Sequence, residues 1–598
     1  MSLPQSETSR GRKGRDTVYP VAFASSSADS SYMDDPALRT LVHFFEKKGL
    51  AALKEEDRLE QWYDDWMEYQ KEQGLYASIL SPQQYSNRGN CFDLLRYSRF
   101  LEGFAYCSPA HGYSLQVSFL GLFSILMGTN AQLKKEAVAA MEAGSLMAFG
   151  VSEKDHGSDL MANEFTVAES DGGFIANGAK YYIGNTDAAS MISILGRRIS
   201  RRESSAEGTI GRANRAPFML LALRPGQAAA FRSLGKIRTL GVRAANVGSF
   251  EVKDHWVPAG DIIAEGRNAW DAVFGTITLG KFFLGFGSVG ICEHALQEAV
   301  THLRKRKLYG KAVLEMPHIR ANVLRAWLRL TAMKLYAYRA LDYVHAASSS
   351  DRRYLLFCAV QKAKVSTEGL KVMSLLQECI GAKGFESSGY FEMALRDIQL
   401  IPSLEGSMHI NLGLAVQFIP RYFDRPDSTL GQPPSLVGVE TPSRENPYLM
   451  EARAGSTHAV GFLPFLDAYR PLDSLNGIAP FLRQVKVFRE IATAKSDGNA
   501  ATSDLQLEMA LGQCFATVTY GQLIAENAVR LDLPEAITSS IFAVLVEDLS
   551  SLALRLAGIP GIRTEMRESI SRMIEVPNLS SADWEFVGRH FEETAVKN

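Results

Sequence analysis

Three short segments of the chain combine residue types that can carry chemistry. Residues 149–159 (FGVSEKDHGSD) form a turn rich in small and hydroxyl side chains. Such turns present backbone N–H groups and serine oxygens to a pyrophosphate or to a flavin carbonyl. Residues 178–185 (GAKYYIGN) read as a strand whose two aromatic side chains suit a flat ring. Residues 403–412 (SLEGSMHINL) place Glu405 before a helix, where a carboxylate can act as a general base.

Each of these segments also has an ordinary structural explanation when it is taken alone. Gly-Ser-Asp turns are common, aromatic strands usually pack in a core, and a glutamate at a helix start usually serves the helix dipole. Other motifs are missing: no GxGxxG follows a strand, and no Walker loop, HExxH or GxSxG occurs. The 11 histidines show no metal-ligand spacing. The sequence therefore does not support a nicotinamide, ATP or zinc enzyme, and we predict no metal site.

The elements that must position these segments follow a clear order. Helical periodicity precedes the first segment, short β-branched and aromatic runs with turns surround the second, and long helical stretches lead to the third. The predicted fold is α+β but mainly α, with a middle β-barrel or sandwich and a four-helix bundle. We predict a disordered arm (1–36), an N-terminal helical domain (37–147), a β domain (148–262), a bundle that carries Glu405 (263–424), a Pro-rich linker (425–455) and a helical extension (456–598).

Composition limits the class of protein. A hydrophobic content of 46% is typical of globular chains, and a net charge of -2 argues against a dedicated nucleic-acid binder. No apolar run approaches the length that crosses a membrane, and no apolar segment follows the basic start as a secretory signal requires. The 6 cysteines form no CxxC pair, so we expect buried free thiols and a cytoplasmic location. The insertion at 197–217 has 6 arginines against 2 glutamates, as in a solvated loop or a surface that docks an acidic or phosphate-bearing partner.

The order of the segments resembles that of a known family. Residues 128–144 (GTNAQLKKEAVAAMEAG) are similar to the Gly-Thr-x-x-Gln-Lys helix of the acyl-CoA dehydrogenases, and residues 149–159 resemble their Thr-Glu-Pro-Gly-Ala-Gly-Ser-Asp turn. Residues 306–313 (RKLYGKAV) resemble Arg-x-x-Phe-Gly-Lys, and ECIGAKGF with FEMALRDIQLIPSLEGS resembles the final block. The resemblance covers about residues 40–425. The chain is thus identified as a member of the acyl-CoA dehydrogenase and acyl-CoA oxidase superfamily, in a long form with an extra helical domain.

The resemblance implies an activity and a set of site residues. It implies FAD-dependent α,β-dehydrogenation of an acyl thioester, with Glu405 removing the α proton and flavin N5 accepting the β hydride. Leu404 and Gly406 then flank the substrate, and Gly280 or Lys281 stands where some members carry a different base. The implied FAD contacts are Phe149, Val151, Ser152, Gly157, Ser158, Tyr182, Gly184, Arg306, Gly381, Ser407 and His409. Arg306 and the turn at Gly381 contact the FAD of a neighbouring subunit, which implies a homodimer or homotetramer.

Departures from the family pattern leave alternatives open. Gly184 replaces a threonine expected near flavin N5, as in acyl-CoA oxidases, and this loss opens space for oxygen. The acceptor is then O2 or an electron-transferring flavoprotein. Lys154, Asp155 and His156 replace Pro-Gly-Ala, which leaves open whether the acyl carrier is CoA or a carrier protein. A flavin monooxygenase or a non-catalytic flavoprotein that binds a partner on the same fold are further alternatives. We also expect burial to raise the pKa of Glu405.

Overall fold

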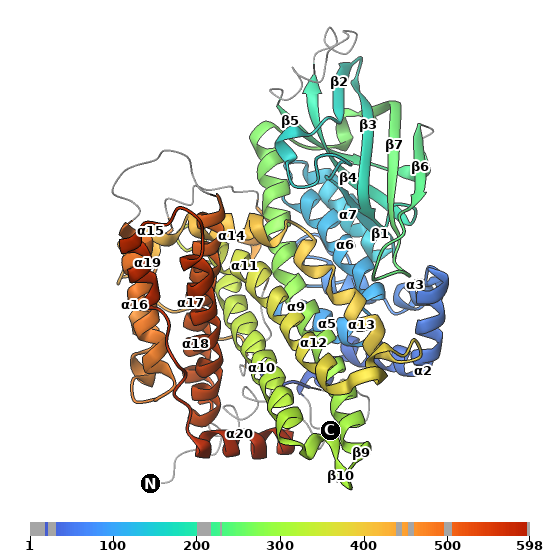
Figure 1. Cartoon of the computed structure of the whole chain (residues 1–598). Helices are drawn as coiled ribbons and strands as arrows, with labels where there is room; N and C mark the ends of the chain where they lie inside the picture. The colour runs from blue at the N-terminus through green and yellow to red at the C-terminus, as the bar shows by residue number, and fades with distance from the viewer. Residues whose placement is uncertain are drawn as a thin grey trace, which may run out of the picture.

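The computed structural model describes residues 18–21, 31–199, 217–227, 230–437, 445–451, 460–494 and 505–594. The β domain stands at one end of a helical body, and the C-terminal helices lie along one side of that body (Figure 1). Most of the predicted disordered arm, and most of the Arg-rich insertion, lie outside the described residues. The architecture is the predicted one: mainly helical, with a middle β domain and extra C-terminal helices.

The N-terminal part is a set of helices that supports one face of the β domain. The first long helix begins at Pro36, because the Asp35 carboxylate accepts from the backbone N–H of Ala37 and a proline suits the first turn. Helix α6 is buried around almost its whole circumference, so its few polar side chains lie inside the protein. The helices are α2 (Pro36–Leu59), α3 (Asp64–Glu72), α4 (Leu75–Leu80), α5 (Leu94–Cys107), α6 (Pro109–Leu126) and α7 (Ala131–Glu142).

The β domain is one strongly bent sheet with strand order β6-β7-β3-β2-β4-β5-β8, and β1 pairs in parallel with β4. Its longest pairing joins β3 to β7, with an irregularity between Tyr181 and Ile183 that leaves Tyr182 out of the ladder. The strands are β1 (Leu146–Gly150), β2 (Thr166–Ser170), β3 (Gly173–Gly184), β4 (Ala189–Ile199), β5 (Phe218–Leu223), β6 (Phe231–Lys236), β7 (Val247–Pro258) and β8 (Ile262–Glu265).

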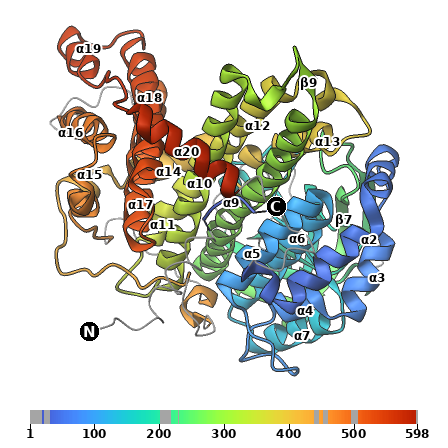
Figure 2. The same cartoon turned by 90° about the horizontal axis from the view of Figure 1, so that it is seen from below.

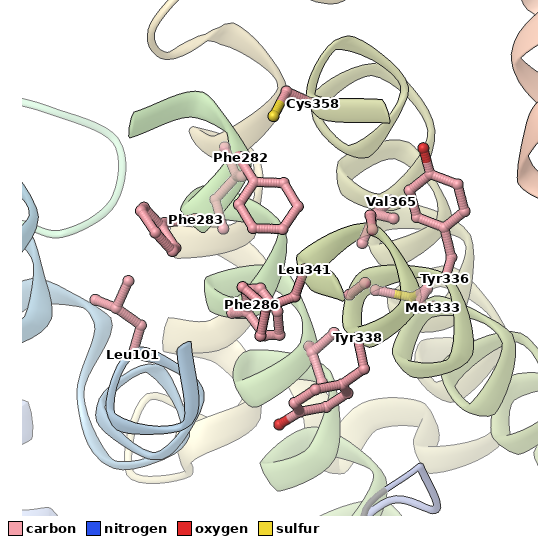
Figure 3. Close-up of a cluster of buried hydrophobic side chains, with 14 of the residues drawn as sticks. Leu101, Phe282, Phe283, Phe286, Met333, Tyr336, Tyr338, Leu341, Cys358 and Val365 are labelled. Atoms are coloured by element: carbon pink, nitrogen blue, oxygen red, sulfur yellow. The ribbon is translucent and has the colours of Figure 1, made fainter. Parts of the chain in front are cut away.

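The bundle is built on two long helices whose aromatic faces meet. Phe282 and Phe286 of α9 lie against Met333, Tyr338 and Leu341 of α10 (Figure 3). A short hairpin of β9 (Lys307–Leu308) and β10 (Lys311–Ala312) joins the two helices. The bundle helices are α9 (Gly266–Lys305), α10 (Pro317–His345), α11 (Tyr354–Val360), α12 (Ser366–Ile380), α13 (Tyr390–Ile398), α14 (Met408–Val416) and α15 (Ile419–Phe423), with a π-helical turn (Gln361–Val365) between α11 and α12.

The C-terminal extension continues the bundle as additional helices. Buried ion pairs fix it to α10: Arg339 donates to Glu526 at 2.8 Å, and Arg329 to Asp548 at 2.9 Å. Helix α20 crosses the ends of α10 and α18, as the view from below shows (Figure 2). The extension comprises α16 (Ile478–Ala494), α17 (Leu505–Arg530), α18 (Glu535–Ala557), α19 (Thr564–Ser571) and α20 (Ser581–Thr594).

Two of the described helices, α9 and α18, are long and apolar enough to cross a membrane by length and composition. Their most apolar stretches are 72% and 67% buried inside the protein, as in core helices. All 6 cysteines are free, as the sequence predicts; 4 of them are buried, whereas Cys91 and Cys107 are only partly buried.

Candidate active site

Glu405 lies in the turn between α13 and α14, in a backbone conformation that is unusual for its residue type. Its φ is 51°, and Gly406 follows with a φ of 90°. A non-glycine residue in the left-handed region is held there by its surroundings and often marks a functional site. The buried Asn411 side chain donates to the carbonyl oxygens of Gly406 and Ser407, both at 3.0 Å, and so fixes the turn. Ser407 caps α14 by accepting from Ile410 N at 3.5 Å.

The Glu405 carboxylate points into the protein, although the residue as a whole is half-buried. Its Oε1 accepts from Gln116 Nε2 at 3.1 Å, and the same amide donates to Gly280 O at 3.0 Å. Tyr97 in turn donates to Gln116 Oε1 at 3.0 Å. A side chain at position 280 would clash with Glu405 Oε2, so glycine makes room for the carboxylate. Within the described residues, Oε2 is buried and has no hydrogen-bond partner.

This environment changes the proton affinity of the carboxylate as expected from the sequence. Burial raises the pKa of Glu405 to about 7, while the hydrogen bond from Gln116 and the charges of Lys362 and Lys281 act in the opposite direction. A carboxylate with a pKa near neutrality is suited to general-base work, since it is partly ionised yet binds a proton well.

An apolar cavity of about 70 Å³ lies beside the Glu405 turn. Its lining includes Leu404, which precedes Glu405, and Gln116, which donates to the Glu405 carboxylate. Tyr113 of α6, Phe283 of α9 and Leu101 of α5 also line it. A larger cavity of about 550 Å³ lies between the bundle and the extension, but its lining is mostly charged and polar. The small apolar cavity is therefore the better site for a hydrocarbon group.

The turn at 149–159 is hydrogen-bonded to the aromatic strand. Ser152 Oγ donates to Tyr181 O at 2.7 Å, and Tyr181 N donates to Ser152 O at 3.0 Å. The turn leaves Gly157 and Ser158 exposed, with backbone and hydroxyl groups available to a ligand. Tyr182 has a φ of 60° and a side chain that is 59% exposed. An exposed aromatic ring on the strand, and exposed glycine and serine residues in the turn bonded to that strand, suit a flat ring with an attached pyrophosphate.

A buried ion pair supports this turn from below. Lys180 Nζ donates to Glu153 Oε1 at 2.7 Å, and both side chains are almost fully buried. Glu153 also accepts from the backbone N–H groups of Glu164 at 2.8 Å and Phe165 at 3.0 Å, so it closes the loop that carries Ser158. Burial lowers the pKa of Lys180 to about 8, although the Glu153 charge opposes this effect.

The structure corrects one expectation about Gly184. A Cβ at this position would lie 2.5 Å from Val117 Cγ2 and 2.8 Å from Tyr113 Cε1. Both side chains come from α6, and they fill the space that the missing side chain was expected to open. Of the other predicted flavin contacts, Val151 is buried and Phe149 is partly buried, and both lie at or just after the end of β1.

The remaining predicted cofactor residues divide into two groups. His409 is exposed at the start of α14, close in sequence to Glu405 and Ser407. Arg306 and Gly381 lie near each other at the opposite end of α9. About 26 residues of α9 separate Gly280 from Arg306, or roughly 40 Å at about 1.5 Å per residue. One protomer therefore does not bring both groups to one flavin.

Exposed aromatic side chains follow Arg306 and Gly381 closely in the sequence. Tyr309 of the hairpin is 97% exposed, and Phe385 after Gly381 is 70% exposed. Large exposed apolar side chains often mark contact surfaces. The contribution of Arg306 and Gly381 to a neighbouring subunit's cofactor, and with it the homodimer or homotetramer, stays a prediction.

Several site residues were not identified from the sequence. Tyr113 and Gln116 lie in an apolar helix, and Lys362 lies in the π-helical turn. A polar or charged residue inside a helical pattern is the signal that marks all three. Asn411 gives no such signal, because a polar residue near a helix start is ordinary.

Comparison with known proteins agrees with this geometry. The family model for the acyl-CoA dehydrogenase C-terminal domain matches residues 269–419, which include Gly280 and Glu405. The cyclohex-1-ene-1-carbonyl-CoA dehydrogenase of Syntrophus aciditrophicus is 22% identical over 335 residues, covering 56% of this chain and 77% of that protein.

Solved structures show the same fold. The butyryl-CoA dehydrogenase of Megasphaera elsdenii superposes with a TM-score of 0.58 at 18% identity, over 66% of this chain and 99% of the other. An acyl-CoA dehydrogenase from Bacillus anthracis, solved with FAD, superposes with a TM-score of 0.73 at 15% identity, over 95% of this chain and 96% of the other. That coverage includes the C-terminal extension. Residues 269–419 therefore match the C-terminal domain of the acyl-CoA dehydrogenases, and the chain has the fold of the solved acyl-CoA dehydrogenases with additional C-terminal helices.

Proposed function

We propose that the protein catalyses FAD-dependent α,β-dehydrogenation of an acyl thioester, with Glu405 as the base. The observation that carries this proposal is the buried Glu405 carboxylate, held by Gln116, a residue that also lines a small apolar cavity. The similarity to acyl-CoA dehydrogenases supports it.

The chain's own residues supply the proton-transfer half of this reaction. Gln116 fixes Glu405 Oε1, which leaves Oε2 as the oxygen that takes the α proton. The Asn411 amide holds the turn so that the carboxylate does not swing away. Removal of the α proton and loss of a hydride from the β carbon together leave a C=C bond. FAD, when bound beside Ser152 and Tyr182, supplies the two-electron acceptor for that hydride.

The cavity favours a short acyl group. Its volume of about 70 Å³ holds only a few methylene groups. Farther along, α5 and α9 approach closely, since a side chain at Gly290 would clash with the Glu102 backbone. A long chain would have to displace packed helices.

An anaerobic bleaching screen tests the proposal and the chain-length inference together. The flavin-loaded protein is mixed with butyryl-, hexanoyl- and palmitoyl-CoA without air, and flavin absorbance is followed. We expect rapid bleaching with the two shorter thioesters and at least several-fold slower bleaching with palmitoyl-CoA. Fastest bleaching with palmitoyl-CoA would contradict the chain-length inference, and no bleaching with any acyl-CoA would contradict the proposed reaction.

The packing beside Gly184 supports an electron-transferring flavoprotein over O2 as the acceptor. Because Tyr113 and Val117 fill this space, we expect the reduced protein to reoxidise slowly in air. Replacing Tyr113 with Ala should open the space and speed reoxidation several-fold, while Tyr113→Phe, which retains the ring, should behave as the wild type.

Stopped-flow mixing of chemically reduced protein with air-saturated buffer measures this without any acyl substrate, so the role of Tyr113 in lining the cavity does not interfere. Rapid reoxidation of the wild type would instead favour the oxidase alternative. Equal rates in the wild type and Tyr113→Ala would show that this side chain does not control oxygen access.

A further inference from the structure

The helix pair α11 and α12 is interrupted by a π-helical turn whose five residues, Gln361–Val365, are all buried. A π turn places side chains in directions that a regular helix does not allow, and such turns frequently occur at functional sites. Two of the five are lysines, and Lys362 has an exposed fraction of 0%. A fully buried lysine is costly to keep charged, so its neighbours decide what it does.

Lys362 is connected to the segment that carries Glu405. Its Nζ donates to the backbone carbonyl of Ile401, at the start of the segment that ends in the Glu405 turn. Lys281 of α9 also acts on the carboxylate through its charge. Gln116 holds the carboxylate from α6. The base is thus held by an amide on one helix and is affected by the charges of two buried amines on other elements.

The titratable groups around Glu405 come from four elements. Tyr97 lies on α5, Tyr113 on α6, Lys281 on α9 and Lys362 in the π turn. Burial raises the pKa of both tyrosines far above neutrality, so they stay uncharged. Cys358 of α11 interacts with Lys281, and burial raises the pKa of its thiol to about 12. The two lysines are therefore the groups that bring positive charge to the base.

The charges on the two lysines and on Glu405 depend on one another. Burial lowers the pKa of Lys362 to about 7, while the Glu405 charge raises it and the Lys281 charge lowers it further. Burial likewise lowers the pKa of Lys281 to about 8. Each protonated lysine favours the ionised carboxylate, which is the form that accepts the α proton.

We propose that Lys362 is a positioning residue for Glu405, which fixes the Ile401–Glu405 segment and supplies the positive charge that keeps the carboxylate ionised. This role rests on the proposed function of Glu405 as the base. The Lys281 charge acts in the same direction but more weakly, and Lys362 also donates to Ile401 O, so Lys362 carries the larger share.

Lys362→Met tests the proposal, because methionine is similar in length and neutral in a buried site. Without the charge, the acidic limb of the kcat/KM profile should move upward by about one pH unit or more, so activity at pH 7 falls about fivefold or more and most of it returns at pH 9. Lys362→Arg, which retains a charge, should recover part of the wild-type profile.

Lys364→Met is the matched control. Lys364 is buried in the same turn, but it pairs with Glu368 at 3.1 Å and Asp548 at 3.5 Å. Its loss should lower stability and leave the acidic limb where it is in the wild type. A shift of that limb in Lys364→Met equal to that in Lys362→Met would overturn the assignment to Lys362.

A second measurement is independent of substrate and flavin. Infrared difference titration follows the protonated carboxyl band that disappears in Glu405→Gln, with an expected wild-type midpoint at about pH 7. The midpoint should rise in Lys362→Met and stay unchanged in Lys364→Met. An unchanged midpoint in folded Lys362→Met overturns this proposal, whereas failure of every acyl-CoA to bleach the wild type overturns the proposed function alone.

Discussion

Replacing Glu405 with glutamine is expected to abolish flavin bleaching by acyl thioesters, with a loss of at least about 10³-fold in rate. The amide has nearly the volume of the carboxylate but cannot take the α proton. No second carboxylate is available at the alternative base position, because Gly280 and Lys281 stand there. Stopped-flow anaerobic bleaching at substrate saturation measures the effect. Bleaching of Glu405→Gln at the wild-type rate would show that another group is the base.

A stability measurement separates loss of the base from loss of the fold. The pKa of Glu405 in the folded protein, about 7, lies above its ordinary value of 4.5. The folded state therefore gains stability from the protonated carboxyl at low pH, and this gain is lost as pH rises through about 7. Glutamine is neutral throughout, so we expect Glu405→Gln to melt at or above the wild-type temperature at pH 8, and the difference to shrink toward pH 5.

Glu405 could be singled out from the sequence because of the order of the segments that lead to it. A Glu-Gly pair before a helix is ordinary by itself, and its place after an ordered set of helices and strands distinguishes it. Its chemistry could not be predicted in the same way. Gln116 lies 289 residues away in sequence and reaches the carboxylate only because α6 packs against α9. Long-range packing, and not local pattern, decides the proton affinity of the base.

Gly184 also shows that a prediction made from one residue can fail when its neighbours in space are unknown. A glycine where a larger residue is expected suggests free space, and that inference uses only the residue itself. Whether the space exists depends on neighbours from another element, and here Tyr113 and Val117 of α6 occupy it. The sequence predicts a missing side chain correctly but cannot predict what fills its place.

The extension was predicted as helices because their apolar periodicity is strong. Its attachment was not predictable, because it depends on charged residues inside the protein. Arg339 of α10, with an exposed fraction of 0%, pairs with Glu526 of α17. From a sequence pattern, a charged residue in a helix is predicted to be exposed to solvent. Buried ion pairs between helices distant in sequence can therefore be identified only from the structure.

Breaking the buried ion pair beneath the 149–159 turn should remove flavin binding altogether. In Glu153→Gln, Lys180 keeps its buried position and loses its charged partner, which costs about 3–5 kcal/mol when one member of a buried pair is removed. The backbone N–H groups of Glu164 and Phe165, which donate hydrogen bonds to the Glu153 carboxylate, lose a charged acceptor as well. We expect the variant to purify colourless, with a clearly lowered midpoint of urea unfolding.

The pH dependence of that loss identifies its cause. Burial holds the pKa of Lys180 near 8 even with Glu153 present. Because the Glu153 charge raises this pKa, removing that charge lowers the pKa of Lys180 further. The folded variant must then release the Lys180 proton, and this cost shrinks by about 1.4 kcal/mol for each unit that pH rises toward the ordinary lysine value. The stability deficit should therefore be smaller at pH 9 than at pH 7.

The exposed pair of Glu169 and Arg198 in the same domain provides the matched control. Glu169→Gln removes a carboxylate partner that is 55% exposed, so its effect on stability should be small and its flavin content normal. If Glu153→Gln retained its flavin and unfolded at the same urea concentration as Glu169→Gln, the buried pair would not be what holds the turn. If instead its deficit were the same at pH 7 and pH 9, the loss would come from the backbone contacts of Glu153 and not from the unpaired charge of Lys180.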